Sequence, residues 1–251
     1  MRVLDLFAGI GGFTLGLERA GFETVAFCEI EPYAQKVLAK HWPGVPIYDD
    51  VRQLTAERLI RDGIGVDVIT GGFPCQDVSA SGRKAGIDGE RSGLYRELLR
   101  ICEEVQPRYV LIENVRNLLS GDKGGWFRQF LRDFSKVGFD AEWHVIPASS
   151  LGASHKRERV WIVAYPSSPR SEAGLPEAGY RQAWNPEITH YLGDRLAWWQ
   201  GCRKWEPEPR LDRVVDGFPS RSHRLKCLGN AVVPQIPELI GRAILEAENA
   251  G

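Results

Sequence analysis

The sequence predicts an α/β fold, in which a parallel β-sheet carries helices on both faces. Short apolar runs of strand length alternate with helix-like segments up to about residue 165, which is the pattern of such a sheet. Polar or glycine-rich motifs follow several of these runs, and ligands of parallel sheets bind beyond the carboxyl ends of the strands. With 43% hydrophobic and 26% charged residues over 251 positions, the chain has the composition of a globular protein with a packed core.

The first elements are a strand, a glycine turn and a helix. Arg2–Phe7 is a short apolar run, the letters AGIGG form the turn, and the helix spans about Phe13–Ala20. Gly21 is expected to end this helix, because glycine adopts the left-handed backbone of a helix C-terminus without strain. The next apolar run, Thr24–Cys28, is followed directly by Glu29.

The following elements continue the alternation. Pro32 begins a helix to about Lys40, since the first turn of a helix does not need its N–H, and Thr55 can cap a helix that runs to about Arg61. Further helices are expected at Leu94–Val105 and near Trp126–Lys136, and further strands at Ile47–Tyr48, Asp67–Thr70, Tyr109–Ile112, Glu142–Pro147 and Arg159–Ala164. The last helix is expected to pack back on the sheet, because one of its faces carries Ile236, Leu239, Ile240, Ala243, Ile244 and Ala247.

The pattern divides the chain into three parts. Residues 1–165 form the sheet domain, residues 166–212 a small irregular region, and residues 213–251 a C-terminal segment that returns to the sheet domain. The formal net charge of −1 gives no support for nucleic-acid binding by the chain as a whole. A local surplus of positive charge lies between Arg195 and Lys226, where eight Lys and Arg accompany four acidic residues.

The cysteines and the apolar runs indicate the compartment. The five cysteines are odd in number and show no C-x-x-C spacing, which argues against a disulfide framework or a zinc site and for a reducing environment. No run approaches the ~18–20 apolar residues of a membrane helix, and the N-terminal run lacks the basic start of a signal peptide. We therefore expect a soluble cytoplasmic protein without a metal or a membrane contact.

The first two strand ends carry a pattern typical of a nucleotide-like ligand. In the run Asp5–Gly12, glycines let a ligand approach the backbone, and the N-terminus of the next helix offers free N–H groups. Glu29 ends the second strand, where an acid can bind the hydroxyls of a ribose. The run lacks the third glycine of G-x-G-x-x-G, which favours an adenosine cofactor without a pyrophosphate. A tight turn that binds nothing is the alternative that these residues leave open.

A cysteine follows the fourth strand in the motif GGFPCQ. Pro74 fixes the backbone just before Cys75, so the thiol can be aimed at a ligand and act as a nucleophile. The alternative is a buried structural cysteine, which is the role expected for Cys28, Cys102, Cys202 and Cys227. For Cys75 this alternative is disfavoured, because a Pro-Cys-Gln sequence preceded by two glycines is poor core sequence.

Two further motifs carry charged groups suited to catalysis. Glu113 ends an apolar strand, where burial raises the pKa of a carboxyl group and favours proton donation. A helix-capping pair, Glu113 with Asn114, is the alternative. Arg157 and Arg159 enter a strand at positions i and i+2, so they share a face that can hold an anion or polarise a carbonyl. The alternative for the arginines is a solvated charge run.

Taken together, these motifs resemble those of the DNA (cytosine-5) methyltransferases. DLFAGIGGF resembles the cofactor-loop motif of that family, GGFPCQ its Pro-Cys motif, ENV its Glu-Asn-Val motif, KRERVWIVA its Arg-x-Arg motif and GNAVVP, from Gly229, its last block. The likeness covers nearly the whole length, and five motifs in the family's order are highly specific. It implies a Rossmann-like, S-adenosylmethionine-dependent methyltransferase sheet, with a small irregular target-recognition region in residues 166–212.

The resemblance also implies the residues that bind S-adenosylmethionine. Phe7 would contact the adenine and Asp50 its amine, while Glu29 would bind the ribose hydroxyls. Asn230 would close the cofactor site. The methionine part would be contacted by Gly9, Ile10 and Gly12, and further cofactor contacts would come from Ile30, Val51, Pro74, Leu94 and Val232.

The implied reaction transfers a methyl group from S-adenosylmethionine to C5 of a cytosine within a specific duplex DNA sequence. The base would be flipped out of the helix, and Cys75 would attack its C6 to form a covalent intermediate. Glu113 would hydrogen-bond N3 and the exocyclic amine, and Arg159 would hold O2. Arg157 would support the thiolate and a nearby phosphate.

The compact size favours a role in a restriction–modification system or in the self-protection of a phage. A monomer is expected, because the sequence shows no dimerisation signature. A cognate restriction endonuclease acting on the same site is the candidate protein partner. Two alternatives stay open: a catalytically inactive DNA-binding relative, which the intact Cys75 and Glu113 argue against, and an RNA cytosine-5 methyltransferase. A dinucleotide-dependent oxidoreductase leaves the motifs GGFPCQ and ENV unexplained.

Overall fold

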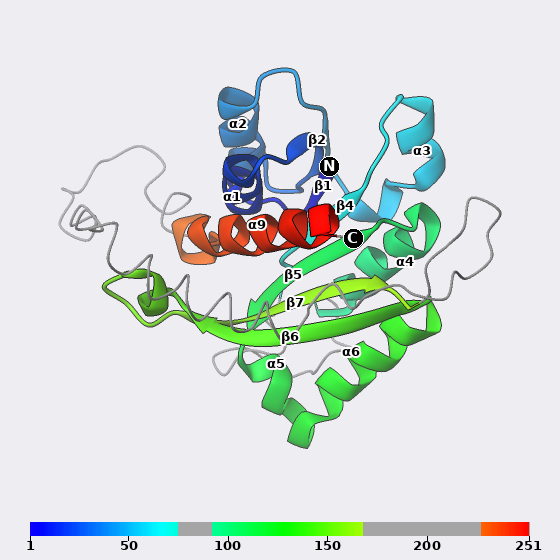
Figure 1. Cartoon of the computed structure of the whole chain (residues 1–251). Helices are drawn as coiled ribbons and strands as arrows, with labels where there is room; N and C mark the ends of the chain where they lie inside the picture. The colour runs from blue at the N-terminus through cyan, green and yellow to red at the C-terminus, as the bar shows by residue number, and fades with distance from the viewer. Residues whose placement is uncertain (75–91, 168–226, 251) are drawn as a thin grey trace.

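A seven-stranded sheet forms the centre of the molecule (Figure 1). The computed structural model describes residues 1–74, 92–167 and 227–250. The strand order is β3-β2-β1-β4-β5-β7-β6. The strands are β1 (Arg2–Leu6), β2 (Glu23–Cys28), β3 (Ile47–Tyr48), β4 (Val68–Gly71), β5 (Tyr109–Val115), β6 (Phe139–Pro147) and β7 (Glu158–Pro166).

All helices except the short one at Asn117–Ser120 lie where the sequence predicts them, with small shifts of their ends. They are α1 (Gly12–Ala20), α2 (Pro32–His41), α3 (Ala56–Arg61), α4 (Tyr95–Val105), α5 (Asn117–Ser120), α6 (Gly125–Lys136) and α9 (Gln235–Ala250). Thr55 caps α3, because its hydroxyl accepts a hydrogen bond from the N–H of Arg58 at 3.2 Å. Gly21 ends α1 in the left-handed conformation, with φ of 106°. Both capping predictions are confirmed.

The sheet is parallel, as predicted, only as far as β5. Strands β3, β2, β1, β4 and β5 pair in parallel, whereas β7 runs antiparallel to both β5 and β6. Strands β6 and β7 follow each other through a short connection that holds only the 3-10 turn Ala148–Leu151. Without a helix crossing over the sheet, two consecutive neighbouring strands pair antiparallel. The parallel part contains the strand ends at which the sequence places the site.

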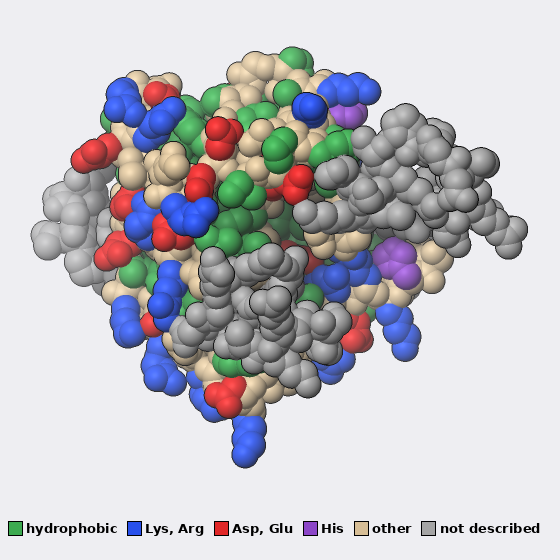
Figure 2. Space-filling view, turned by 180° about the vertical axis from the view of Figure 1, so that it is seen from behind, with side chains coloured by type: hydrophobic (Ala, Val, Ile, Leu, Met, Phe, Trp, Pro, Cys, Tyr) green, Lys and Arg blue, Asp and Glu red, His purple; other side chains and the backbone are tan. Residues whose placement is uncertain are grey.

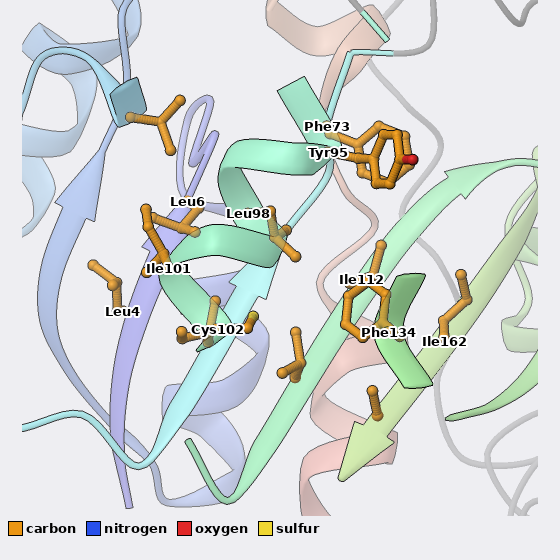
Figure 3. Close-up of a cluster of buried hydrophobic side chains, with 14 of the residues drawn as sticks. Leu4, Leu6, Phe73, Tyr95, Leu98, Ile101, Cys102, Ile112, Phe134 and Ile162 are labelled. Carbon is orange, nitrogen blue, oxygen red and sulfur yellow. The ribbon is translucent and has the colours of Figure 1, made fainter. Parts of the chain in front are cut away.

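Helices cover both faces of the sheet and enclose a core on each side. One core packs α1 and α9 against side chains of the sheet such as Val3, Val68 and Leu111. The other core packs α3, α4 and α6 against the alternate side chains of the same strands, among them Ile69 and the two residues Leu4 and Ile112 labelled in Figure 3. The alternation follows the two-residue period of a strand, so that both faces of β1, β4 and β5 are buried.

Strand β5 is longer than its apolar run predicts. The sequence places Glu113 and Asn114 at the end of the strand, and in the structure they belong to it and pair with Trp161 and Val160 of β7. The antiparallel partner extends the ladder of hydrogen bonds beyond the last aliphatic residue. Glu113 therefore has a fixed strand backbone, and its side chain lies against the neighbouring strand β7.

Three kinds of partner, namely a membrane, a metal ion and a nucleic acid, would each require particular features of the described residues. None of their helices is long and apolar enough to cross a membrane, and none of their His, Cys, Asp and Glu side chains form a metal-binding group of three. On the face seen in Figure 2, Lys and Arg side chains stand beside Asp and Glu. The predicted boundary at residue 165 falls within the last two residues of β7. The boundary at residues 212 and 213, nearly all of the recognition region 166–212 and the basic surplus lie outside the described residues.

Candidate active site

The glycine loop after β1 has a backbone that few side chains tolerate. Phe7, Gly9 and Gly11 all have positive φ angles, of 54°, 56° and 84°. A Cβ atom on Gly11 would lie 2.6 Å from the ring of Trp42, so only glycine fits there. A Cβ atom on Gly9 would meet nothing within 4 Å. The ring of Trp42 thus packs against the backbone of the loop at Gly11, whereas the space beside Gly9 is open.

Glu29 is bound to this loop by backbone hydrogen bonds. Its Oε2 accepts from the N–H of Gly9 at 2.7 Å, and its Oε1 accepts from the N–H of Glu31 at 2.8 Å. The side chain is nearly buried, at 9% exposure, at the carboxyl end of β2. Each carboxylate oxygen has a second lone pair, so both can accept a further bond from a ligand hydroxyl. The structure therefore brings together two of the predicted cofactor residues.

Asp50 and Val51 follow β3 at the neighbouring strand end. The carboxylate of Asp50 accepts from the backbone N–H and from Nε of Arg52, each at 3.0 Å. The hydrogen bond from the Arg52 side chain is the main cause of the lowered pKa of Asp50, which keeps the group an acceptor. The carbonyl oxygens of Val51 and Leu54 both accept from Nη2 of Arg100 on α4, at 2.9 Å. Ile30, next to Glu29, leaves 63% of its surface exposed.

The segment Gly72–Pro74 connects β4 to the predicted nucleophile. Asn114 of β5 is buried and donates from Nδ2 to the carbonyl oxygen of Phe73 at 3.3 Å. The ring of Phe73 packs against that of Tyr95, at a centroid distance of 5.9 Å (Figure 3), and against that of Phe130, at 6.1 Å. Pro74 is thereby placed beside the end of β5. Cys75 follows it directly in the chain and lies outside the described residues.

Glu113 and Arg159 form an ion pair across β5 and β7. The distance from Nε of Arg159 to Oε1 of Glu113 is 2.9 Å, and the side chains are 22% and 11% exposed. Burial raises the pKa of Glu113, and the charges of Arg159 and Arg157 offset part of this rise. A Cβ atom on Gly72 would lie 3.4 Å from Oε2 of Glu113, so the segment before Cys75 passes beside this carboxyl group. An acid with a raised pKa at this place can hold a proton for a ligand.

Arg157 precedes β7 and contacts the segment before α9. Its Nη1 donates to the carbonyl oxygen of Gly229 at 2.9 Å, and its Nη2 donates to that of Ala231 at 2.7 Å. Asn230 lies between these two acceptors and is exposed. Val232 follows and touches Gly12, the first residue of α1, because a Cβ atom on Gly12 would lie 2.6 Å from the oxygen of Val232.

Comparison of the sequence with known protein families identifies the family of the chain. The sequence model of the family described as "C-5 cytosine-specific DNA methylase" matches residues 1–198. The chain belongs to this family.

Curated relatives support the assignment to the C-5 cytosine-specific DNA methylases. The chain is 39% identical to the Type II methyltransferase M2.BsuMI of Bacillus subtilis over 168 residues, which are 65% of this chain and 42% of the relative. It is 34% identical to the Type II methyltransferase M.NgoMIV of Neisseria gonorrhoeae over 205 residues, or 80% of this chain and 64% of the relative. The match thus spans about two fifths of the length of the first relative and just under two thirds of the second.

Solved structures have the same fold at lower sequence identity. A chain described as a DNA modification methyltransferase encoded within an E. coli prophage gives a TM-score of 0.67 at 19% identity, and the match covers 99% of both chains. The Dnmt2 methyltransferase of S. pombe gives a TM-score of 0.65 at 16% identity, again over 99% of both chains. These likenesses confirm the predicted α/β, Rossmann-like fold.

The remaining predicted site residues lie around the same strand ends. Phe7 and Leu94, the latter just before α4, pack on the same core, and Ile10 lies in the glycine loop. The sequence interpretation missed three supporting residues, namely Trp42 under the loop, Arg100 on the Val51 segment and Asn114 on Phe73. Trp42 packs on the backbone of Gly11, and Arg100 donates to the backbone carbonyl of Val51. Because every residue has a backbone, such contacts cannot be recognised from the sequence. Asn114 belongs to a motif that was singled out, and its capping alternative concerned a helix rather than a loop.

Proposed function

We propose that the chain transfers a methyl group from S-adenosylmethionine to C5 of a cytosine in duplex DNA, with Cys75 as the nucleophile. The observation that carries this proposal is the buried Glu113, which pairs with Arg159 at 2.9 Å beside the backbone that leads to Cys75. The family's name and the names of the Type II relatives support the same substrate. The intact Cys75, Glu113 and Arg159 argue against the alternative of a catalytically inactive relative.

The residues at the ends of β1 to β3 fit the adenosine part of S-adenosylmethionine. Glu29 is held by two N–H groups and has free lone pairs for ribose hydroxyls, and Asp50 has a lowered pKa that suits an acceptor for the adenine amine. The exposed Ile30 and the half-buried Phe7 offer apolar surface to the adenine. The open space at Gly9 accommodates the methionine part, with Ile10, Gly12, Val51, Pro74, Leu94, Asn230 and Val232 as further contacts. When bound, the cofactor supplies an electrophilic methyl group.

The proposed chemistry uses three side chains on a base flipped out of the duplex. The Cys75 thiolate adds to C6 of cytosine, while Glu113 donates a hydrogen bond or a proton at N3 and Arg159 binds O2. This addition turns C5 into an enamine-type carbon, which takes the methyl group. Loss of the C5 proton to a base then restores the ring double bond and expels the thiolate. Arg157 was assigned to the thiolate and a nearby phosphate, and its contacts are considered further below.

The biological setting proposed is that of a modification enzyme. The substrate is a specific duplex sequence, read by the recognition region 166–212. A cognate restriction endonuclease is the proposed protein partner, in a restriction–modification system or a phage that protects its own DNA. We also propose a monomer that works in the cytoplasm.

The test uses duplex DNA in which cytosine is replaced by 5-fluorocytosine. Fluorine at C5 cannot leave as a cation, so the enzyme should remain bonded to C6 after methyl transfer. A long duplex of varied sequence is incubated with the protein and S-adenosylmethionine and run on a denaturing gel. We expect a protein–DNA adduct that requires the cofactor and is absent in the Cys75→Ser variant.

A second cysteine provides the matched control. Cys102 is fully buried in α4, and burial raises the pKa of its thiol far above neutrality. The Cys102→Ser variant should therefore form the adduct as the wild type does. An adduct that persists in Cys75→Ser would contradict the role of Cys75. No adduct with DNA, but one with 5-fluorocytosine-containing tRNA, would move the substrate from DNA to RNA.

A further inference from the structure

The guanidinium group of Arg157 joins the two ends of the candidate site. The residue lies directly before β7, whose Arg159 pairs with Glu113 at the end where the base is proposed to bind. Yet Arg157 itself donates to the carbonyl oxygens of Gly229 and Ala231, at 2.9 and 2.7 Å. These two carbonyls flank Asn230, the residue proposed to close the cofactor end. Two arginines that are two positions apart thus act on different parts of the site.

The backbone of Arg157 adopts a strained conformation in this arrangement. Its φ angle is 30°, in the left-handed region that non-glycine residues rarely adopt. Because Arg157 precedes the strand in this conformation, the alternation of a regular strand does not determine the direction of its side chain. Such strained residues persist where the surrounding structure holds them, and they concentrate at functional sites.

The segment held by Arg157 rests on the glycine loop. Val232 lies so close to Gly12 that a Cβ atom there would come within 2.6 Å of its oxygen and 2.9 Å of its own Cβ. Gly12 follows directly on the loop whose Gly9 N–H binds Glu29. Residues 229–232 are therefore fixed on one side by a charged fork and on the other by the first turn of α1.

We propose that Arg157 is a positioning residue for the cofactor site, which holds residues 229–232 in place so that Asn230 and Val232 close over S-adenosylmethionine. This inference rests on the proposed function. The planar fork of arginine can donate to two carbonyl oxygens at once, and its charge strengthens both hydrogen bonds. Loss of the Arg157 guanidinium group removes both hydrogen bonds to residues 229–232 and weakens cofactor binding. The ion pair between Glu113 and Arg159 does not depend on these hydrogen bonds and stays in place.

The experiment measures the Kd of S-adenosylmethionine by calorimetry in the absence of DNA, together with kcat and KM. For Arg157→Gln we expect a Kd raised roughly 10-fold or more, as for the loss of charge-assisted hydrogen bonds. A positioning role should raise the KM for S-adenosylmethionine by a larger factor than it lowers kcat at saturating cofactor, and the pH profile of kcat should keep its shape. Arg157→Lys, which keeps the charge without the fork, should have an intermediate Kd, and it decides the question if the glutamine variant does not fold.

Arg242→Gln is the matched control. Its guanidinium donates from α9 to the carbonyl oxygen of Arg19 at 3.0 Å, so it ties the same C-terminal segment to α1 away from Gly12. This variant should lower the thermal midpoint of unfolding and leave the Kd unchanged. An equal rise of Kd in Arg242→Gln would overturn the proposal, since general loosening of α9 would then explain both variants.

The outcome also separates the two roles considered for Arg157. A wild-type Kd for S-adenosylmethionine in Arg157→Gln, with a fall in kcat or a weaker salt-dependent affinity for DNA, would overturn the positioning role in favour of contact with the thiolate or a phosphate. A wild-type protein that does not bind S-adenosylmethionine at all would contradict the proposed function itself.

Discussion

Asp5 illustrates how a single residue supports the site without facing it. Its carboxylate is fully buried and accepts hydrogen bonds from the hydroxyls of Thr14, at 2.9 Å, and Thr70, at 2.7 Å. It therefore ties β1 to α1 and to β4, directly before the glycine loop. Burial raises the pKa of Asp5 to about 6, although both hydroxyls act in the opposite direction.

The raised pKa of Asp5 predicts a specific pH dependence of stability. The folded protein binds this proton more tightly than the unfolded chain, so the free energy of unfolding falls as pH rises from about 4 to about 6. In the Asp5→Asn variant this contribution is absent, while the amide can still hydrogen-bond both threonines. As pH rises from about 4 to about 6, the free energy of unfolding of the variant should therefore increase relative to that of the wild type by up to about 3 kcal/mol. Urea unfolding at pH 4, 5, 6 and 7 measures the difference, and parallel curves for the two proteins would contradict it.

At the scale of elements, the close contact between α1 and α9 requires glycine at Gly16 of α1 and Gly241 of α9. A Cβ atom on Gly16 would lie 2.7 Å from Cγ of Pro237 and 2.9 Å from the backbone N of Glu238. A Cβ atom on Gly241 would lie 2.8 Å from Leu17. The two helices therefore approach each other backbone to backbone, which brings the segment before α9 down to the glycine loop.

Gly16→Ala distinguishes packing from helix propensity. Propensity alone predicts that alanine stabilises α1 by about 1 kcal/mol. Packing predicts the opposite, because the new methyl group meets backbone atoms that cannot turn aside, at a cost of about 1–3 kcal/mol. We expect a net loss of about 1–2 kcal/mol in the free energy of unfolding, measured in urea.

Gly229→Ala is the control for this substitution. A Cβ atom on Gly229 would meet nothing within 4 Å, and its φ angle is not positive. Its stability should equal or slightly exceed that of the wild type. A Gly16→Ala protein as stable as Gly229→Ala would mean that α9 shifts without cost.

At the scale of the whole molecule, the sequence predicted the elements better than their contacts. Apolar runs and caps depend on local chemistry, so β3 and the cap of α3 were placed correctly. The length of β5 depends on its partner β7, which is distant in sequence, so the apolar run that ends at Ile112 did not predict that the strand extends to Val115. The same reason explains the arginine contacts of Arg100 and Arg157, since their acceptors are backbone carbonyls, which any residue supplies. The motifs identify the chemistry, but the structure is needed to see which residues hold the motifs in place.

The last helix closes the core of the whole molecule and should be indispensable for folding. Ile236, Leu239, Ile240 and Ile244 are each at most 2% exposed and pack between α1 and the sheet. Burial of one such side chain contributes about 1.5–3 kcal/mol, so the four together approach the whole stability of a domain, about 5–15 kcal/mol. A chain that ends before Gln235 should lose its cooperative unfolding transition, followed by circular dichroism in urea. A chain that ends after Asn249 keeps the contact of Glu248 with Tyr109, at 2.7 Å, and should unfold as the full chain does. A cooperative transition at the wild-type midpoint in the shorter chain would show that the sheet is stable with this face uncovered.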